Sequence, residues 1–353
     1  MPPLTITENA PLAHYTTLGV GGPARYLVEA ATEEQVLEAL EMAASQGWPV
    51  FVLGSGSNVL FADAGFPGLV LRIATRGIEA GNSNCLTAAG GEGWDALVRL
   101  SVKRELAGIE CLSGIPGTVG ATPVQNVGAY GEEVGATIRS VRVLDRRTGR
   151  IGELSNAECG FAYRSSIFCT SQRDRHVILA VTFELKPGGR PSVAYPDVER
   201  FFGGRAGLAS PWEVRQAVLL IRQSKGMLLD PADPESRTAG SFFKNPVIGE
   251  DALHAAEAAA RRLGFLAEPQ SLPQFRTAAG TYKIPAAWLI EQAGIRKGCG
   301  TGHVSISSRH ALAIITRPGA TASEVIEFAQ QIRGRVEAVF GIRLELEPVQ
   351  AGF

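Results

Sequence analysis

The first clear pattern of apolar and polar positions runs from residue 32 to residue 58. Thr32-Glu-Glu-Gln35 has the form of a capping box, and apolar residues then recur at helical spacing until Gly47. The short apolar run Pro49–Leu53 follows and predicts a buried strand. That strand leads directly into Gly54-Ser-Gly-Ser-Asn58. This order predicts a β-α-β-like start of the fold, with a glycine loop at the end of a strand.

The middle of the chain, from about Leu69 to Phe183, alternates short apolar runs with glycine. Leu69–Ile73 and Val141–Leu144 are two such runs, and Trp94–Glu105 has the spacing of one short helix. We therefore predict an α+β domain of mixed strands. The tract Lys186–Ser210 is marked by Pro, Gly and Tyr, and it predicts a domain boundary or an ordered loop.

From Pro211 onward the pattern is mainly helical. The ranges with helical spacing or a capping signal are Pro211–Gln223, Asp251–Leu263, Pro285–Gln292 and a final helix that begins after Thr321. Ala311–Ile315 is a strand candidate. Ile342–Glu347 alternates apolar and polar residues, which predicts a terminal strand with glutamates on one face.

Composition narrows the class of protein. The chain has 353 residues, is 45% hydrophobic and 20% charged, and carries a formal net charge of −1. This is typical of a globular protein of two or three domains, without a field that attracts nucleic acid or anionic membranes. The five cysteines form no C-x-x-C pair, and the five histidines lack the spacing of metal ligands. We expect no metal site, no signal peptide, no membrane insertion and a cytoplasmic location.

Two glycine-rich segments are candidates for phosphate binding. Gly54-Ser-Gly-Ser-Asn58 lacks the third glycine of a Rossmann fingerprint, because Val59 occupies that position, and taken alone it favours a plain turn. In the segment Ser113–Gly131, glycines recur with few charges between them. Such a segment presents many backbone amides to a diphosphate. The alternative is a long surface loop, which usually carries more charge and less Ile and Val.

Three further residues have both an ordinary and a functional interpretation. Arg164 lies among apolar neighbours, where it either pairs with a structural carboxylate or binds a substrate anion, and the local sequence favours the structural role. Ser241 follows Gly240 without a Gly-x-Ser-x-Gly elbow, so a cap or turn is its default role. Glu347, in the terminal Leu-Glu-Leu-Glu run, is by default a solvated residue.

Taken together and in this order, the motifs resemble those of the UDP-N-acetylenolpyruvoylglucosamine reductases, flavin enzymes of bacterial peptidoglycan synthesis. The matching blocks are Thr17–Gly22, Leu53–Leu60, Gly114–Gly120, Gln125–Gly131, Tyr163–Phe168, Arg222–Lys225, Gly240–Pro246 and Leu344–Glu347. They span nearly the whole chain, and their joint agreement is far more specific than any single motif.

The resemblance implies non-covalent FAD, with NADPH as co-substrate, in a pair of domains of the vanillyl-alcohol-oxidase (PCMH) type, followed by a C-terminal α+β substrate-binding domain. The implied bounds are 1–70 for the first FAD-binding subdomain (with strand 340–353 returning to the flavin side), 71–210 for the second, and 211–339 for the substrate-binding domain. The implied cofactor-binding residues are Leu53, Gly54, Ser55, Gly56, Ser57, Asn58, Ser113, Gly114, Ile115, Pro116, Gly117, Gly120, Asn126, Gly128, Ala129, Tyr163 and Arg222.

The resemblance also implies the reaction. NADPH reduces the flavin, and the enolpyruvyl group of UDP-N-acetylglucosamine enolpyruvate then takes a hydride on its methylene carbon and a proton on the adjacent carbon. Arg164 and Glu347 stabilise the negative charge that develops, with Glu345 as the alternative carboxylate, and Ser241 delivers the proton. The long interval from Arg164 to Lys225 resembles the longer form of the family, which has a tyrosine-bearing insert.

In that form, Tyr195 and Lys225 contact the uridine diphosphate part of the substrate, and Asn245 joins them. Two departures stand out: residues 226–237 form a longer link than usual, and Pro348 follows the last glutamate. We expect a monomer that binds no nucleic acid. The competing hypotheses are another flavoprotein of the same fold, such as a sugar or alcohol oxidase, and a non-catalytic protein that binds a nucleotide sugar or flavin.

Overall fold

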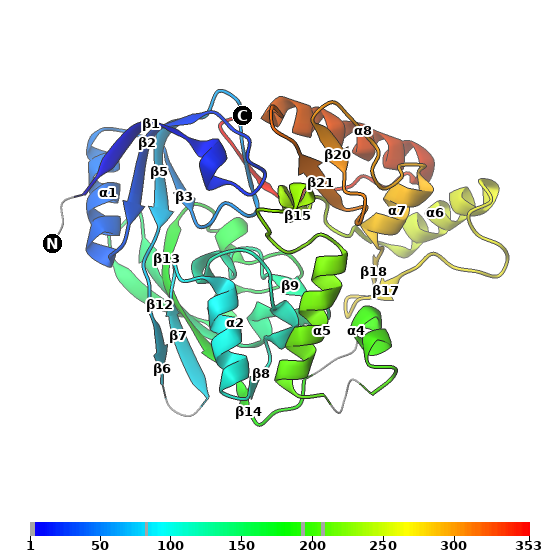
Figure 1. Cartoon of the computed structure of the whole chain (residues 1–353), viewed down its shortest axis with the longest axis horizontal. Helices are drawn as coiled ribbons and strands as arrows, with labels where there is room; N and C mark the ends of the chain where they lie inside the picture. Colours follow the sequence, from blue (N-terminus) through cyan, green and yellow to red (C-terminus); the bar gives the residue numbers. More distant parts are fainter. Residues whose placement is uncertain (1–3, 82–83, 192–194, 206–208) are drawn as a thin grey trace. The chain divides into compact units, whose positions relative to one another are not determined.

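The computed structural model describes residues 4–81, 84–191, 195–205 and 209–353, and its chain forms two compact units. Unit 1 comprises Met1–Ala10, Ala24–Gly56 and Phe66–Leu228, and unit 2 comprises Pro11–Pro23, Ser57–Gly65 and Leu229–Phe353. Figure 1 follows the chain through both. Within the described residues, no helix is long and apolar enough to cross a membrane.

The first sheet of unit 1 is built on the predicted helix–strand start. Its strands, in spatial order, are β1 (Ile6–Pro11), β2 (Pro23–Ala30), β5 (Phe66–Ile73) and β3 (Val50–Leu53). Strands β2 and β3 both run parallel to β5. Helix α1 (Glu33–Ser45) starts where the Thr32 hydroxyl accepts the Gln35 amide, and its buried Val36 packs into the core of this sheet. The predicted N-cap at Thr32, the helix and the strand are therefore confirmed, and the Gln35 side chain accepts the amide of Ala31.

The second sheet of unit 1 is antiparallel. Its strands, in spatial order, are β12 (Ile151–Ser155), β11 (Ile138–Asp145), β13 (His176–Glu184), β7 (Cys85–Ala89) and β6 (Ile78–Ala80). Helix α2 (Trp94–Lys103) packs on it, with the fully buried Trp94 against Phe183 of β13. Parallel and antiparallel strands thus both occur in unit 1, as the mixed α+β prediction requires.

The remaining elements of unit 1 are short strand pairs and helices around the second glycine-rich segment. They are β8 (Leu106–Ala107) with β14 (Lys186–Pro187), β9 (Gly128–Ala129) with β10 (Glu132–Glu133), α3 (Asn156–Cys159), α4 (Pro196–Phe201) and α5 (Pro211–Ser224). A capping box between Ser210 and Glu213 starts α5 at the predicted Pro211. The predicted boundary tract Lys186–Ser210 contains β14 and α4, while its residues 192–194 and 206–208 lie outside the described part of the chain.

Unit 2 contains a four-stranded antiparallel sheet with helices around it (Figure 1). The sheet order is β15 (Thr238–Ser241), β21 (Ala313–Thr316), β20 (Val304–Ile306) and β19 (Gly300–Thr301). The other elements are β16 (Val247–Ile248), β18 (Tyr282–Lys283) and β17 (Phe275–Arg276) in a small sheet, α6 (Glu250–Arg262), α7 (Ala286–Gln292), α8 (Ala322–Phe340), and the parallel pair of β22 (Val349–Ala351) with β4 (Val59–Phe61). The predicted cap at Thr321 forms a capping box with Glu324 at the start of α8.

The predicted terminal strand Ile342–Glu347 is wrong as a regular strand. Ile342 and Leu344 are buried and the residue between them is exposed, so the alternation of burial is real. However, only Leu346 forms a bridge, to Phe243, and the hydrogen-bonded strand begins later, at Val349. Pro348 separates the two stretches, and because proline has no N–H to donate, a continuous ladder cannot pass through it.

Candidate active site

The two glycine segments of unit 1 meet at Gly54 and Thr118. A Cβ placed on Gly54 would lie 2.5 Å from the Thr118 hydroxyl oxygen, so a larger residue would force the Thr118 side chain or its loop to shift. Thr118 belongs to the loop that the backbone holds against the end of β7, because Gly120 donates to the carbonyl of Gly90 at 2.8 Å. The loop after β3 and the loop after α2 are therefore brought together, although 64 positions separate Gly54 from Thr118 in the sequence.

These loops have the features that a flavin dinucleotide site needs. The Ser55 hydroxyl is buried and has no hydrogen-bond partner among the described residues, which is costly unless a ligand supplies one. Gly56 and Gly114 adopt positive φ, 68° and 70°, which points successive backbone amides in a way that suits a phosphate. The predicted cofactor residues fall in unit 1, apart from Ser57 and Asn58, which continue the first loop into unit 2. The residues present fit the cofactor.

Two of the predicted cofactor-binding residues form side-chain hydrogen bonds within the protein. Asn126 is buried, and its side-chain amide bonds Glu133, the carbonyl of Ala162 and the amide of Gly135, at 2.8 to 3.0 Å. It therefore ties the second glycine segment to the loop that carries Arg164. The Ser113 hydroxyl donates to the carbonyl of Glu110 at 2.6 Å.

Arg164 is held in a strained turn beside the second glycine segment. Its φ is 51°, a conformation that non-glycine residues rarely adopt, and it sits in the tight bridge between Ala162 and Ser165. Its guanidinium donates to the carbonyl of Gly128 at 2.8 Å and lies 5.4 Å from the ring centre of Tyr163. A Cβ on Gly128 would lie 2.7 Å from the carbonyl oxygen of Glu132, so the turn that presents the Gly128 carbonyl to Arg164 requires glycine.

Helix α5 ends in a cluster that contains three of the predicted ligand-contacting residues, Tyr195, Arg222 and Lys225. Arg222 is buried, donates to the carbonyl of Met227 at 2.6 Å and leaves its Nε without a partner among the described residues. Burial raises the pKa of the neighbouring Tyr130 to about 12, and the Arg222 guanidinium only partly offsets that effect. Lys225 forms an ion pair with Asp197, at 2.5 Å.

In unit 2, Ser241 is the last residue of β15, and the chain just after it pairs with the C-terminal segment. The amide of Phe242 donates to Leu312 at 2.8 Å, and its carbonyl accepts the amide of Glu347 at 3.0 Å. The amide of Lys244 donates to the carbonyl of Glu345, also at 3.0 Å. Phe242, the residue after Ser241, is therefore hydrogen-bonded to Glu347, although Ser241 and Glu347 are far apart in the sequence.

The backbone around this pair is rigid. Phe242 and Phe243 are at most 1% exposed. Burial of each such ring contributes roughly 1.5–3 kcal/mol, so displacing the chain at Ser241 carries a large energetic cost. Gly240, with φ of 74°, provides the irregular step in the ladder between β15 and β21. The ring burial and the special backbone together fix the direction of the half-buried Ser241.

Asn58 joins the same network. Its side-chain amide donates to the carbonyl of Glu347 at 3.3 Å, and its own carbonyl accepts the amide of Val349 at 2.9 Å. Glu345 differs from Glu347, because its side chain is 77% exposed and its carboxylate lies 3.5 Å from Lys244 Nζ. Glu347 is half-buried. The end of the first glycine loop, Ser241 and Glu347 thus lie within one stretch of hydrogen-bonded backbone.

Asn245, the third predicted substrate residue, caps a helix. Its side-chain oxygen accepts the amide of Ala286, the first residue of α7, at 2.9 Å. This places the residue between the Phe242–Lys244 segment and α7 and fixes its side chain. Among the described residues, no group of three His, Cys, Asp or Glu side chains could hold a metal ion.

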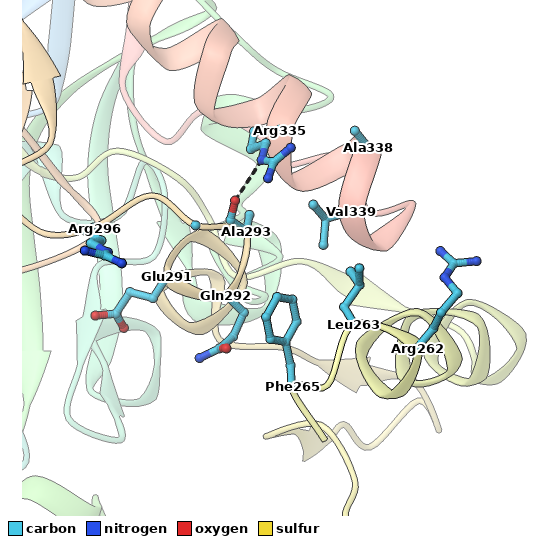
Figure 2. A pocket seen from close by; sticks show the side chains of 11 residues that line it. Arg262, Leu263, Phe265, Glu291, Gln292, Ala293, Arg296, Arg335, Ala338 and Val339 are labelled. Carbon is cyan, nitrogen blue, oxygen red and sulfur yellow. Dashed lines mark hydrogen bonds between the residues drawn. The ribbon is translucent and has the colours of Figure 1, made fainter. Parts of the chain in front are cut away.

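A cavity described in unit 2 does not coincide with these residues. Figure 2 shows this cavity, of about 390 Å³, near the C-terminal ends of α6, α7 and α8, where Arg335 Nε donates to the carbonyl of Ala293 at 2.9 Å. Its lining includes Leu263, Phe265 and Val339, and none of the predicted site residues.

Several residues that organise the site were not predicted. Asp95 in α2 accepts the amide of Gly114 at 2.6 Å and pairs with Arg215 of α5 at 2.7 Å. Burial alone would raise the pKa of Asp95, but Arg215 and the Gly114 amide hold it below its usual value. Thr17 donates to the carbonyl of Thr238 at 2.6 Å, next to the Ser241 strand. Thr17 lies in a matched sequence block, whereas nothing local in the sequence singles out Asp95.

A buried carboxyl pair lies beneath the second glycine segment. Glu110 accepts the amides of Gly108 and Ile109, and Glu132 accepts the amide of Cys111. Burial and the nearby Glu110 carboxylate raise the pKa of Glu132 to about 8 from an ordinary value of 4.5. Folding then favours the protonated form, so the contribution of Glu132 to stability is greatest below pH 4.5 and is lost as pH rises toward 8.

Replacing Glu132 by glutamine should therefore change how stability depends on pH. The glutamine amide stays neutral and its oxygen still accepts the Cys111 amide, so the melting temperature of the variant minus that of the parent should be more positive at pH 8.5 than at pH 5.5. A difference of a few °C is expected, since one kcal/mol corresponds to roughly 2–4 °C in a domain of about 150–250 residues and to less in a longer chain. Glu79→Gln, an exposed position in β6, is the control. Equal differences at both pH values would contradict the assignment.

Both parts of the chain match families of known proteins. Residues 24–155 match the family model "FAD binding domain", and residues 231–351 match "UDP-N-acetylenolpyruvoylglucosamine reductase, C-terminal domain". The UDP-N-acetylenolpyruvoylglucosamine reductase of Thermobifida fusca is 43% identical over 99% of this chain and 98% of its own length. That of Streptomyces coelicolor is also 43% identical, over 99% of this chain and 91% of its own length. The crystal structure of the enzyme from Thermus caldophilus is 25% identical, covers 99% of both chains and gives a TM-score of 0.66.

Proposed function

The chain belongs to the UDP-N-acetylenolpyruvoylglucosamine reductase family, and on this basis we propose a role for each residue of its candidate site in NADPH-dependent, flavin-mediated reduction. The reaction reduces the enolpyruvyl double bond of UDP-N-acetylglucosamine enolpyruvate to give UDP-N-acetylmuramate for peptidoglycan. The observation that carries the assignment of the chemistry is the backbone pairing that joins Ser241 to Glu347 through Phe242. FAD, which the two glycine loops of unit 1 would hold, would supply hydride-transfer chemistry when bound and reduced by NADPH.

Ser241 is the proton donor in this proposal. After hydride addition, the carbon next to the carboxylate is a strong base, so even a weakly acidic hydroxyl can protonate it. What the transfer needs from the protein is position, and the buried Phe242 and Phe243 and the special φ of Gly240 supply it. Ser241 therefore acts as an acid in the second half-reaction, with no nucleophilic role.

Arg164 and Glu347 serve the substrate carboxylate, where negative charge accumulates as an enolate. The planar guanidinium of Arg164 is suited to a carboxylate, and its strained turn and its bond to Gly128 fix it in advance. Glu347 serves as a protonated hydrogen-bond donor, because an ionised carboxylate would repel the developing charge. The half-buried side chain and the tie to Asn58 favour Glu347 over the exposed Glu345.

Tyr195, Lys225 and Asn245 contact the nucleotide part of the substrate in this proposal. Lys225 supplies charge for the diphosphate, and Tyr195 supplies a ring for the uridine. The side-chain oxygen of Asn245 accepts the Ala286 amide, which fixes the direction of the side-chain amide toward the substrate in this proposal. The tyrosine-bearing insert of the longer form and the three-domain division at residues 70, 210 and 339 remain predictions.

One assay tests the proposed function against its rivals. The purified protein should have a flavin spectrum and should consume NADPH beyond one equivalent per flavin only when UDP-N-acetylglucosamine enolpyruvate is present. A yellow protein that reduces oxygen with a sugar or alcohol, or one without turnover, would support the oxidase or the binding-protein alternative. The 43% identity to reductases over nearly the whole chain weighs against both. We also propose a monomer in the cytoplasm, which size-exclusion chromatography and cell fractionation would test.

Replacing Gly54 by alanine should weaken FAD retention. The added Cβ would lie 2.5 Å from the Thr118 hydroxyl, so the Thr118 side chain or the loop that carries it must shift. We expect the dissociation constant for FAD to rise by at least about tenfold, measured by flavin fluorescence on titrating the apoprotein. Gly152→Ala is the matched control, because a Cβ there meets nothing within 4 Å in the same unit.

The clash also predicts a rescue. In the Gly54→Ala, Thr118→Ala double variant the offending hydroxyl is gone, so FAD affinity should recover by most of the loss. If the double variant binds FAD no better than Gly54→Ala alone, the contact between the two loops is not the cause of the weakened binding.

A further inference from the structure

An ion pair joins the short helix α4 to the end of α5. Asp197 is the second residue of α4, and Lys225 follows directly after α5. The Lys225 Nζ and Asp197 Oδ2 atoms are 2.5 Å apart, with side chains 30% and 26% exposed. Both are thus partly withdrawn from water, which strengthens the pair compared with an exposed one and lowers the pKa of Asp197 despite its burial.

Two aromatic rings complete this cluster. Lys225 Nζ lies 5.8 Å from the ring centre of Tyr130, and the rings of Tyr130 and Tyr195 meet edge to face with centres 5.4 Å apart. Tyr195 immediately precedes α4, so the same short segment supplies both Tyr195 and Asp197. The Tyr195 ring thus contacts Tyr130, the Tyr130 ring contacts Lys225, and Lys225 contacts Asp197.

The part of the cluster around Tyr130 and Arg222 is fixed by burial, whereas the part on helix α4 depends on few contacts. Tyr130 and Arg222 are buried, and Arg222 is bonded to the carbonyl of Met227. Helix α4 has only six residues, too few to be stable by itself. Its placement depends on the buried Val198, which packs with Val214 and Val218 of α5, and on the ion pair.

We propose that Asp197 is a positioning residue that prepares Lys225 and Tyr195 for the diphosphate-bearing nucleotide of the substrate, and that it acts through Lys225. This rests on the proposed function, in which those two residues contact the uridine diphosphate. Asp197 itself is repelled by a diphosphate. The Lys225 ammonium has three N–H donors, so one can stay on Asp197 while the others face an anion. Holding the flexible lysine chain in advance reduces the entropy lost on binding.

Two ordinary roles compete with this one. Asp197 lies in the first turn of α4, where a carboxylate stabilises a helix, and its other oxygen lies 3.3 Å from Arg200. Neither role depends on Lys225. The difference between the hypotheses is therefore the energetic coupling between Asp197 and Lys225.

A double-mutant cycle measures that coupling. The variants are Asp197→Asn, Lys225→Ala and the combination, in the flavin-loaded full-length protein, with UDP and UDP-N-acetylglucosamine enolpyruvate as ligands in calorimetric titrations. Asp197→Asn should weaken binding of both ligands by about fivefold to tenfold, and should weaken it by less than about twofold when Lys225 is already alanine. In the control variant Arg200→Gln, at an exposed side chain of α4, the rate constant of flavin reduction by NADPH should stay within about twofold of the parent's.

Controls separate the possible failures. Asp197→Glu keeps the charge and should retain most of the affinity, and Arg200→Gln, at a side chain 77% exposed, should leave affinity unchanged. Melting temperatures establish that each variant is folded. Equal weakening by Asp197→Asn with and without Lys225, or no weakening at all, would overturn the positioning role. Failure of the parent protein's reduced flavin to be oxidised by the enolpyruvyl substrate would instead overturn the proposed function.

Discussion

Ser241→Ala should slow oxidation of the reduced flavin by the enolpyruvyl substrate by at least about 10³-fold, in the upper part of the range for loss of a proton donor. Reduction of the flavin by NADPH should change by less than about twofold, because that half-reaction needs no proton on the substrate carbon. Stopped-flow absorbance of the flavin under anaerobic conditions measures the two steps separately. Equal slowing of both would indicate a damaged site and no proton-donor role.

The conservative variant Ser241→Cys sharpens this test. A thiol carries a transferable proton and is more acidic than a hydroxyl, so oxidation should be faster than in Ser241→Ala. Ser308→Ala, an exposed serine of the same unit, should leave both half-reactions unchanged. If Ser241→Cys is as slow as Ser241→Ala while both bind the substrate normally, transfer from the side chain at this position is excluded.

The sequence predicted those parts of the fold that depend on neighbouring residues. Thr32 and Thr321 cap helices where the spacing of polar and apolar residues places them, because a cap is decided within one turn. The terminal strand was mispredicted for a related reason. The alternation from Ile342 to Glu347 does determine which side chains are buried, but hydrogen bonding depends on a distant partner. That partner, Phe242–Lys244, pairs with it only irregularly, and Pro348 interrupts the ladder.

The candidate site, like the terminal segment, depends on contacts between residues far apart in the sequence, and these contacts were not predicted. Ser241, Arg164 and Glu347 were selected by the order of several motifs, since each residue alone has an ordinary interpretation. What the sequence could not show is how each is held: Glu347 by Asn58 and Phe242, and Arg164 by Gly128. Asp95 and Asp197 escaped prediction because their partners lie 120 and 28 positions away, and only the packing of helices on α5 brings them together.

Glu347→Ala should reduce the rate of flavin oxidation by the enolpyruvyl substrate by about 10²- to 10³-fold, the usual cost of losing one donor to a developing negative charge. Glu347→Gln should lose less, because its amide keeps a hydrogen-bond donor near the substrate carboxylate. Flavin reduction by NADPH should again be nearly unaffected, and the same anaerobic stopped-flow experiment measures both rate constants.

Glu345→Ala is the matched control, two positions away on the same segment. Its carboxylate is exposed and paired with Lys244, so its loss should change either rate constant by less than about threefold, in keeping with the small energies of exposed ion pairs. A large effect at Glu345 and a small one at Glu347 would reverse the assignment. The Glu347 amide donates to the carbonyl of Phe242, the residue that follows Ser241. The positions of Ser241 and Glu347 therefore depend on the same stretch of backbone. A Ser241→Ala, Glu347→Ala variant should therefore be less impaired than the product of the single effects predicts.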